Sequence, residues 1–456
     1  MDVQPTVSAP FLPPKVGVYA YTFRAPGEQS RVHLRVEADG SGLLLTNASR
    51  RYELDSTAVY MAYLFLEGVP VPQAARALSE RFQLSASRAR QEFAAFTEKM
   101  EILVRPEDAC PICALEDSLS YTMPFSSRPT APLRMDLALT YRCSNDCHHC
   151  YNARPRQGPE LSTAEWKKVL DLTWQARIPH VVFTGGEPTL RPDLVELVAH
   201  AQANGQIAGL NTNGRRLKDP AYVAALVDAG LDHVQITLES HDPAVHDRMV
   251  ARSGAWQETV EGIRAALQSR LFVMTNTTLL EDNAPYLQDT LTFLTDLGVP
   301  TFGLNALIYS GRGLNVGRGL AESQLPPLLE MARAHVERSG QRLIWYTPTQ
   351  YCHFDPLQLE LGVKGCTAAL SNMCVEPDGA VLPCQSYYTP LGNLLRDPWD
   401  QIWNHELAVS LRERRGLPAE CQDCTFLAEC GGGCPLARTA GQSAPPVCIQ
   451  PIPPAF

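Results

Sequence analysis

The sequence contains no uninterrupted apolar segment of about 18 residues, which is the length that a membrane-spanning helix requires. Its first twenty residues also lack an apolar run that could act as a signal peptide. The net charge is −10, so acidic residues outnumber basic ones. A chain of this charge neutralises little of the phosphate backbone of a nucleic acid. We therefore expect a cytoplasmic protein with neither a membrane nor a nucleic acid as its partner.

Cysteine is absent from the first 109 residues but reaches 14 in the whole chain. Disulfides rarely persist in a reducing cytosol, so this enrichment indicates metal binding or redox chemistry. The cysteines form three groups, which are Cys110 with Cys113, then Cys143, Cys147 and Cys150, and finally nine residues between Cys352 and Cys448.

The pattern of apolar residues divides the chain into three regions. Residues 14–105 predict a winged-helix-like α+β domain. Its expected strands are 15–22, 31–37 and 43–45. Its first expected helix begins after Asp55 or Ser56, and two further expected helices cover 72–82 and 86–103. In the first helix, the helical spacing of Leu54, Ala58, Met61 and Phe65 predicts the face toward the core. Residues 349–456 are cysteine-dense and have few periodic elements, so we expect metal to organise them.

Strands and helices alternate through the middle region, residues 133–348. The expected strands are 133–139, 180–184, 207–211, 233–238, 271–279 and 301–307. The expected helices are 163–176, 193–204, 219–230, 256–268, 284–297 and 322–338. Six such units predict an α/β fold with a parallel sheet, either curved into a partial (β/α)6 barrel or laid open and doubly wound. In both forms the loops after the strands would carry the chemistry.

The loop after the first of these strands carries Cys143, Cys147 and Cys150 in C-x3-C-x2-C spacing. Cysteine thiolates are the usual ligands of iron–sulfur clusters, and three ligands on four irons leave one iron open to another molecule. A structural zinc site is the alternative, and its fourth ligand would be His148 or His149.

The second expected strand runs directly into Gly185-Gly186-Glu187-Pro188, one unit after the cysteine triplet. Glycine allows close approach of a ligand to the backbone, and glutamate can accept hydrogen bonds from an amino group. This pairing resembles the radical S-adenosylmethionine (radical SAM) superfamily. The resemblance implies a [4Fe–4S] cluster on Cys143, Cys147 and Cys150, the cysteines on which catalysis would depend. S-adenosylmethionine would then chelate the open iron, with its methionine amine near Gly185, Gly186 and Glu187.

Further cofactor contacts follow from the same resemblance. The resemblance implies three more residues at the cofactor. The backbone at Tyr151 would meet the adenine, Thr237 would contact the cofactor carboxylate, and Asn213 follows the third strand. Arg248 or Arg252 could pair with that carboxylate. Glu239 stands where many relatives carry aspartate.

The third region contains Cys366-x12-Gly379-x4-Cys384, then Cys421-x2-Cys424-x5-Cys430-x3-Cys434, and Cys448 after thirteen residues. This order resembles the SPASM extension of peptide-modifying radical enzymes, which implies two auxiliary clusters and therefore three [4Fe–4S] clusters in all. By resemblance the first has the ligands Cys366, Cys384 and Cys434, and the second has Cys421, Cys424, Cys430 and Cys448. The fourth ligand of the first cluster is Cys352 or its competitor Cys374, and with neither bound an open iron could take a substrate thiolate. The alternative for both clusters is a structural role.

Two features lie outside these patterns. Cys110 and Cys113 form a C-x2-C pair without a partner pair nearby, which favours a plain connector over a redox or metal site. Residues 14–105 resemble the PqqD-like element that recognises the leader of ribosomally made precursor peptides, which implies strand addition at a sheet edge. Winged helices also bind DNA, but the mixed charges of 72–104 do not form a basic recognition helix.

These features predict an oxidoreductase that matures a ribosomally made peptide. The resemblance implies reductive cleavage of S-adenosylmethionine to a 5′-deoxyadenosyl radical, which would take a hydrogen from the precursor peptide. A thioether cross-link is the first expected product, before carbon–carbon or carbon–oxygen links. A flavodoxin or ferredoxin would be the reductant. The alternatives are an enzyme of the sulfatase-maturase type, which forms formylglycine, and a non-catalytic iron–sulfur scaffold or peptide chaperone.

Overall fold

The computed structural model describes residues 12–25, 28–47, 50–104, 129–153 and 159–440. The chain divides into two compact units, Met1–Thr122 and Met123–Phe456. Cys110, Cys113 and Cys448 lie outside the described residues. None of the helices in the described part is both long enough and apolar enough to span a membrane.

The first unit is a four-stranded antiparallel sheet followed by three helices, which confirms the three predicted strands and the three predicted helices. The strands, in the order β1-β2-β3-β4, are Gly17–Ala25, Glu28–Val36, Gly42–Thr46 and Arg50–Leu54. The helices are α1 (Ser56–Leu66), α2 (Val71–Phe82) and α3 (Ala86–Val104). Asp55 starts α1, because its side chain accepts hydrogen bonds from the backbone N–H groups of Thr57 and Ala58. Strand β4 was not predicted.

The predicted core face is only part of what α1 packs inward. Leu54, Met61 and Phe65 are partly buried and pack against the cores, and the fully buried side chains of α1 are Val59, Tyr60, Ala62, Leu64 and Leu66. The reason is that α1 packs on two sides. Val59 and Ala62 join a core with the sheet and the end of α3, whereas Tyr60 and Leu64 join a second core with α2 and the start of α3. A helix enclosed in this way has no single apolar stripe.

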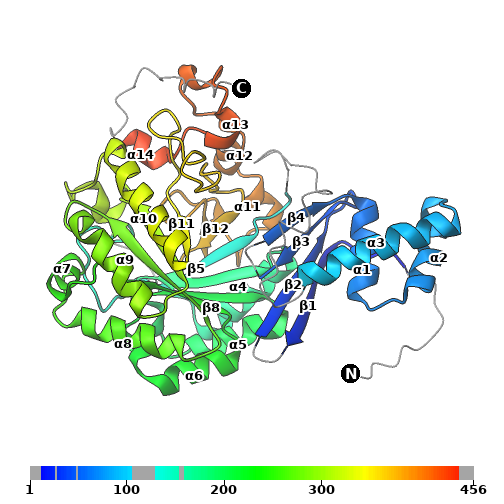
Figure 1. Ribbon diagram of the computed structural model, residues 1–456, viewed down its shortest axis with the longest axis horizontal. Coiled ribbons are helices and arrows are strands. Elements are labelled where there is room, and N and C mark those ends of the chain that lie inside the picture. The colour runs from blue at the N-terminus through cyan, green and yellow to red at the C-terminus, as the bar shows by residue number, and fades with distance from the viewer. Residues whose placement is uncertain (1–11, 26–27, 48–49, 105–128, 154–158, 441–456) are drawn as a thin grey trace. The chain divides into compact units, whose positions relative to one another are not determined.

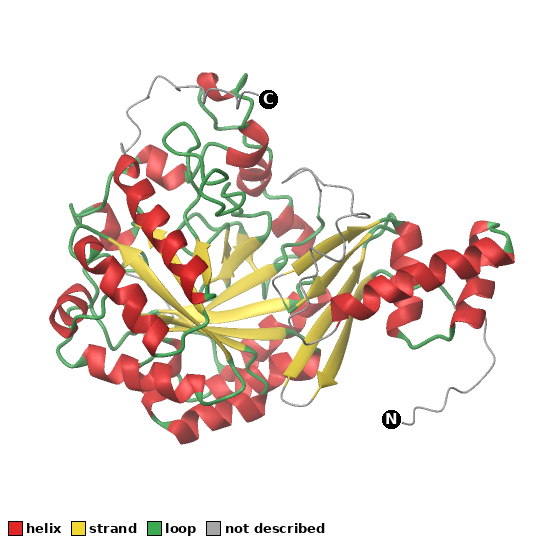
Figure 2. Ribbon diagram, in the orientation of Figure 1, coloured by secondary structure: helices red, strands yellow, loops and turns green. Residues whose placement is uncertain are grey.

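The second unit is built on one ten-stranded sheet in the order β11-β10-β9-β8-β7-β6-β5-β12-β13-β14. The six predicted strands are all present and parallel: β5 (Arg134–Thr140), β6 (His180–Gly185), β7 (Ile207–Thr212), β8 (His233–Thr237), β9 (Phe272–Leu279) and β10 (Thr301–Ala306). The sheet is curved, and Figures 1 and 2 show helices along its outer side. The partial barrel is therefore confirmed over the open alternative.

The helices that cover the outer side match the predicted segments: α4 (Thr163–Gln175), α5 (Leu194–Asn204), α6 (Pro220–Ala229), α8 (Ala255–Leu267), α9 (Leu287–Asp296) and α10 (Leu325–Ser339). Local sequence sets their limits. Ser162 and Glu165 form a reciprocal capping box at the start of α4, and Gly205 ends α5 in the left-handed conformation. The short helix α7 (Pro243–Met249) and strand β11 (Arg342–Trp345) were not predicted.

The cysteine-dense region continues the barrel's sheet. Strand β12 (Asn372–Val375) pairs in parallel with β5, and β13 (Ala380–Leu382) and β14 (Gly392–Asn393) follow it antiparallel. Four short helices complete the region: α11 (Trp399–Trp403), α12 (Glu406–Arg412), α13 (Leu427–Cys430) and α14 (Pro435–Thr439). Because one sheet joins them, residues 133–348 and 349–440 share one compact unit.

Candidate active site

The predicted cysteine triplet lies in the loop that follows β5, at the carboxyl end of the barrel strands. Cys143 is exposed, whereas Cys147 and Cys150 are partly buried. Burial raises the pKa of Cys143 to about 11 and that of Cys147 well above the ordinary thiol value. Each of these two pKa values is raised further by the charge of Cys150. The three sulfurs therefore lie within electrostatic range of one another, and as thiolates they would require a nearby positive charge.

Two arginines hold the backbone of this loop. Arg312, on the short helix η4 (Gly311–Leu314), donates from its guanidinium to the carbonyls of Asp146 and Cys147 at 2.8 and 2.9 Å. Its backbone N–H donates to the Cys150 carbonyl at 2.9 Å. Arg215 donates to the Ser144 carbonyl at 2.7 Å and is itself held by Glu258 at 2.6 Å. The loop conformation is thus fixed by the protein's own donors.

The two glycines after β6 lie against this same loop. A Cβ on Gly185 would stand 2.2 Å from the Thr140 carbonyl oxygen, and one on Gly186 would stand 2.5 Å from that of Arg142. Gly185 also has a φ of 128°. Only glycine permits such close approach, and what approaches these glycines is the protein's own backbone at Thr140 and Arg142. The predicted contact of these glycines with the cofactor amine stays a prediction.

Glu187 is buried and its carboxylate is heavily engaged. Oε1 accepts from the Thr189 and Thr212 hydroxyls, each at 2.7 Å, and Oε2 accepts from the Asn213 backbone at 2.8 Å. Burial raises the pKa of Glu187, although these hydrogen bonds oppose the shift. The carboxylate therefore ties the loop after β6 to the end of β7 and leaves little capacity for an incoming amine.

The other predicted cofactor contacts surround the triplet. Asn213 donates through Nδ2 to the Ser144 hydroxyl at 2.9 Å, which brings it to the cysteine loop. Tyr151 donates from its hydroxyl to Gln385 at 3.1 Å, and its backbone carbonyl accepts from the Tyr388 hydroxyl. Thr237 ends β8, on the same barrel edge. The cofactor-binding role of each stays a prediction.

Glu239 has a partner that sequence reasoning missed. Its Oε1 lies 3.0 Å from Nε2 of His149, and its Oε2 accepts from the Thr278 backbone at 2.9 Å. Its own backbone N–H donates to His246 at 3.1 Å. Glu239 and His149 are both buried. The pair thus joins the segment between Cys147 and Cys150 to the ends of β8 and β9. It also occupies Nε2 of His149, one of the two histidines that could be the fourth ligand in the zinc alternative.

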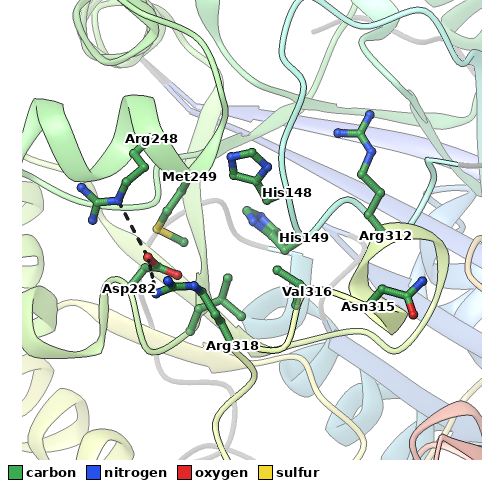
Figure 3. A pocket seen from close by; sticks show the side chains of 10 residues that line it. His148, His149, Arg248, Met249, Asp282, Arg312, Asn315, Val316 and Arg318 are labelled. Carbon is green, nitrogen blue, oxygen red and sulfur yellow. Dashed lines mark hydrogen bonds and ion pairs between the residues drawn. The ribbon is translucent and has the colours of Figure 1, made fainter.

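Arg248 lies in a cavity of about 530 Å³ beside the cysteine loop. Figure 3 shows its guanidinium and that of Arg318 directed at Asp282, at 3.8 and 3.2 Å, with His148 and His149 on the facing wall. Arg312 also lines this cavity, so three guanidinium groups share it with one carboxylate. Such a cavity suits an anionic group. The predicted contact of Arg248 with a cofactor carboxylate stays a prediction.

The C-terminal cysteines form a second convergence. Cys366, Cys384 and Cys434, the predicted ligands of the first auxiliary cluster, are close enough for their charges to interact. Burial raises the pKa of all three thiols, that of Cys366 to about 11. As in the barrel loop, buried thiols that adjoin one another suit a cationic metal cluster.

The two candidates for the fourth ligand have different surroundings. Cys374 on β12 is fully buried beside Ala138 and Leu382, and its charge interacts with that of Cys384. Cys352 is partly buried on the turn after β11. The preceding Tyr351 donates its backbone N–H to the sulfur of Cys430, a predicted ligand of the second cluster, at 3.5 Å. Cys421 and Cys424 lie just before α13. All these ligand roles stay predictions.

The two donor sets fit iron–sulfur clusters. Among the described residues, no three His, Cys, Asp or Glu side chains are gathered as ligands of a single metal ion. Ligands of a four-iron cube stand around a larger body than one ion, and thiolates are the ligands that such clusters use. A parallel-stranded partial barrel with a three-cysteine loop at its carboxyl edge defines a class of cluster-dependent barrel enzymes.

Comparisons with known proteins identify that class. The radical SAM superfamily model matches residues 137–294, and the SPASM model, an iron–sulfur cluster-binding domain, matches residues 366–425. The PqqA peptide cyclase of Rhodopseudomonas palustris is 30% identical over 339 residues, which cover 70% of this chain and 88% of that protein. That of Xanthomonas axonopodis pv. citri is 31% identical over 315 residues, covering 66% and 82%.

Solved structures have the same fold. Streptococcus suis SuiB bound to the precursor peptide SuiA matches with a TM-score of 0.64 and 16% identity, covering 88% of this chain and 94% of that one. SuiB bound to S-adenosylmethionine matches with a TM-score of 0.65 and 17% identity, covering 89% and 94%. The chain belongs to the radical SAM superfamily. It is a radical SAM enzyme with a SPASM domain, and [4Fe–4S] clusters and S-adenosylmethionine are its cofactors.

Proposed function

We propose that this enzyme modifies a ribosomally made precursor peptide and forms a cross-link within it, a thioether being the first expectation. The observation that carries the proposal is that one continuous sheet connects two thiol-lined sites. The first site is the Cys143–Cys150 loop, and the second is formed by Cys366, Cys384 and Cys434. Relatives named PqqA peptide cyclase and the likeness to SuiB bound to its precursor peptide support it. Bound at the barrel loop, the cofactor and cluster would supply a carbon-centred radical.

The protein's own residues would orient that chemistry. Arg312, Arg215 and the His149–Glu239 pair hold the cysteine loop, so the cluster's position does not depend on the cofactor. Asn213 and Tyr151, each bonded to a loop of the same edge, would complete the cofactor site. A preorganised site of this kind lowers the entropic cost of placing a substrate carbon at the reactive position.

The first unit would bind the leader of the precursor. Strands β1 and β4 are the edges of its sheet, and the side chains of β4 alternate between partly buried and exposed. An extended peptide can add to such an edge by backbone hydrogen bonds. The PqqD-like form of this unit, with strands followed by three helices, supports leader binding over a DNA-binding role. The proposed leader-binding domain is residues 14–105, of which the structure describes 14–25, 28–47 and 50–104.

A flavodoxin or ferredoxin would reduce the barrel cluster. Cys143 and His148 are exposed, so the loop that would hold the cluster reaches the surface, where a protein reductant can approach. Photoreduced flavodoxin should support 5′-deoxyadenosine formation in place of dithionite. Formation of 5′-deoxyadenosine with dithionite, but with neither photoreduced flavodoxin nor reduced ferredoxin, would contradict this part of the proposal.

The test uses anaerobically reconstituted full-length protein with dithionite, S-adenosylmethionine and candidate precursor peptides, meaning any short cysteine-rich peptide found to be encoded beside its gene. We expect about twelve irons per chain, 5′-deoxyadenosine, and a peptide that has lost a pair of hydrogen atoms. Fragmentation by mass spectrometry would locate the bond.

Other results would overturn the proposal. Conversion of one cysteine or serine to an aldehyde would establish the formylglycine alternative. Full iron without 5′-deoxyadenosine, even with peptide present, would indicate a scaffold. A leaderless peptide modified as fast as the whole precursor would remove the leader-binding role of the first unit.

A further inference from the structure

Gln385 occupies a position between the two thiol-lined sites. It directly follows Cys384, and its side-chain Oε1 accepts from the hydroxyls of Tyr151 at 3.1 Å and Thr184 at 3.4 Å. Tyr151 directly follows Cys150, and Thr184 directly precedes Gly185. The side-chain amide of Gln385 is therefore bonded to Tyr151 beside the barrel cysteines and to Thr184 beside the predicted cofactor contacts. The backbone of Gln385 adjoins Cys384, a predicted ligand of the auxiliary cluster.

The other half of this amide has no partner. Gln385 is only 6% exposed, and its Nε2 makes no hydrogen bond with any residue that the structure describes. A buried polar group left without a partner costs about 1–3 kcal/mol, so a bound molecule that supplies an acceptor to Nε2 would recover that cost. With Oε1 accepting from the hydroxyls of Tyr151 and Thr184, Nε2 is the end of the amide whose two N–H donors are left for another group.

We propose that Nε2 of Gln385 donates a hydrogen bond to a main-chain carbonyl of the peptide substrate. The carbon that loses hydrogen must lie in contact with the cofactor, and a donor fixed beside the predicted cofactor contacts can hold the adjacent part of the chain. A neutral amide matches a neutral carbonyl and keeps its donor at every pH. Gln385 is thus a positioning residue that sets which part of the peptide meets the radical.

This inference rests on the proposed peptide substrate, and the matched variants Gln385→Glu and Gln385→Met test it. Ionised glutamate keeps both hydrogen bonds accepted from Tyr151 and Thr184 but loses the donor, whereas methionine loses all three. For the peptide that the wild type modifies, we expect each variant to raise KM about five- to tenfold. The ratio of 5′-deoxyadenosine to product should rise by a similar factor, because an unheld peptide leaves more radicals unused.

Gln206→Glu is the control, since it changes a fully buried glutamine at the opposite end of β7. It should lower stability without changing the ratio of 5′-deoxyadenosine to product. The dissociation constant of S-adenosylmethionine without peptide, and the electron paramagnetic resonance spectrum of the reduced auxiliary clusters, should both stay as in the wild type for the Gln385 variants.

Five results would overturn the inference. Wild-type kinetics in Gln385→Glu with a defect only in Gln385→Met would mean that Gln385 merely supports Tyr151 and Thr184. Weaker S-adenosylmethionine binding without peptide would assign the donor to the cofactor, and altered auxiliary spectra would assign it to a cluster. A wild type that modifies no peptide would end the proposed function and this inference together, whereas an active wild type with unaffected variants would end the inference alone.

Discussion

The barrel loop and the C-terminal cysteine array both present cysteines to a cluster, but different interactions stabilise their conformations. The loop at Cys143–Cys150 is held by hydrogen bonds from Arg215, Arg312 and the ends of the strands, all of which exist without a metal. The array around Cys421–Cys434 consists of turns and helices of four or five residues, and α13 and α14 bury none of their side chains. Short helices without a buried face depend on other constraints. The barrel loop is therefore preorganised for its cluster. The array has hydrogen bonds from Arg414 and Arg438 to the carbonyls of Ala428 and Gly432, but with no buried helix face we expect it to need metal as well.

The largest effect should come from removing the barrel triplet. In Cys143→Ala/Cys147→Ala/Cys150→Ala we expect 5′-deoxyadenosine to fall at least about a thousandfold and iron to fall from about twelve to about eight per chain. Chromatography coupled to mass spectrometry and an iron assay measure both. The matched control Cys421→Ala/Cys424→Ala should lose a similar amount of iron but keep 5′-deoxyadenosine formation. Loss of 5′-deoxyadenosine in the control would break the comparison.

Iron removal should separate the two regions directly. In chelator-treated protein we expect fast amide hydrogen exchange across residues 419–440, because the metal that orders them is gone. The backbone of β5 to β10 should keep its protection, because the parallel sheet and the helices on its outer side form without metal. Exchange mass spectrometry with and without iron measures this difference. Equal loss of protection in both regions would mean that the barrel also needs its cluster to fold.

Glu239→Ala tests the internal support of the barrel loop. It leaves His149 and the Thr278 N–H without their buried partner, so we expect a loss of about 3 kcal/mol in the free energy of unfolding. Urea denaturation of iron-free protein measures it. Glu196→Ala, which removes an exposed pair with Lys167, should cost less than about 1 kcal/mol. Similar costs in the two variants would show that the pair does not support the loop.

The smallest effect concerns acid sensitivity at the other end of the barrel. Burial, assisted by the charge of Arg134, lowers the pKa of His233 to about 4 in the folded chain, and its ring lies 2.8 Å from that of His180. A lowered histidine pKa contributes stability that is present above the unfolded value near 6.5 and lost as pH falls toward 4. Iron-free protein should therefore lose about 2 kcal/mol between pH 8 and pH 5 from this group.

His233→Gln should reduce that loss, because glutamine does not titrate. Urea unfolding of both proteins at several pH values measures the difference. An identical pH dependence in wild type and variant would mean that His233 does not govern the acid sensitivity of the barrel.

Much of this architecture could be predicted because it is local. Short apolar runs, separated by segments with helical spacing, located all six βα units, and their order implied a parallel sheet. Strand β12 was missed because its four residues become a strand by pairing with β5 and β13, which are distant or similarly short. The full core of α1 was not predicted for a related reason, since packing on two sides buries more of the helix than a single stripe of apolar residues.

The site divides in the same way. The sequence alone determined the chemistry, because thiol spacing and the Gly-Gly-Glu-Pro turn depend only on neighbouring residues. Only the tertiary structure decided what supports that chemistry: Arg312 beneath the Cys147 carbonyl, Glu239 beside His149, and Gln385 against Tyr151. These partners are separated by 165, 90 and 234 positions in the chain. Contacts at such distances carry no local pattern, because they form only after the sheet has curved and brought its loops to one edge.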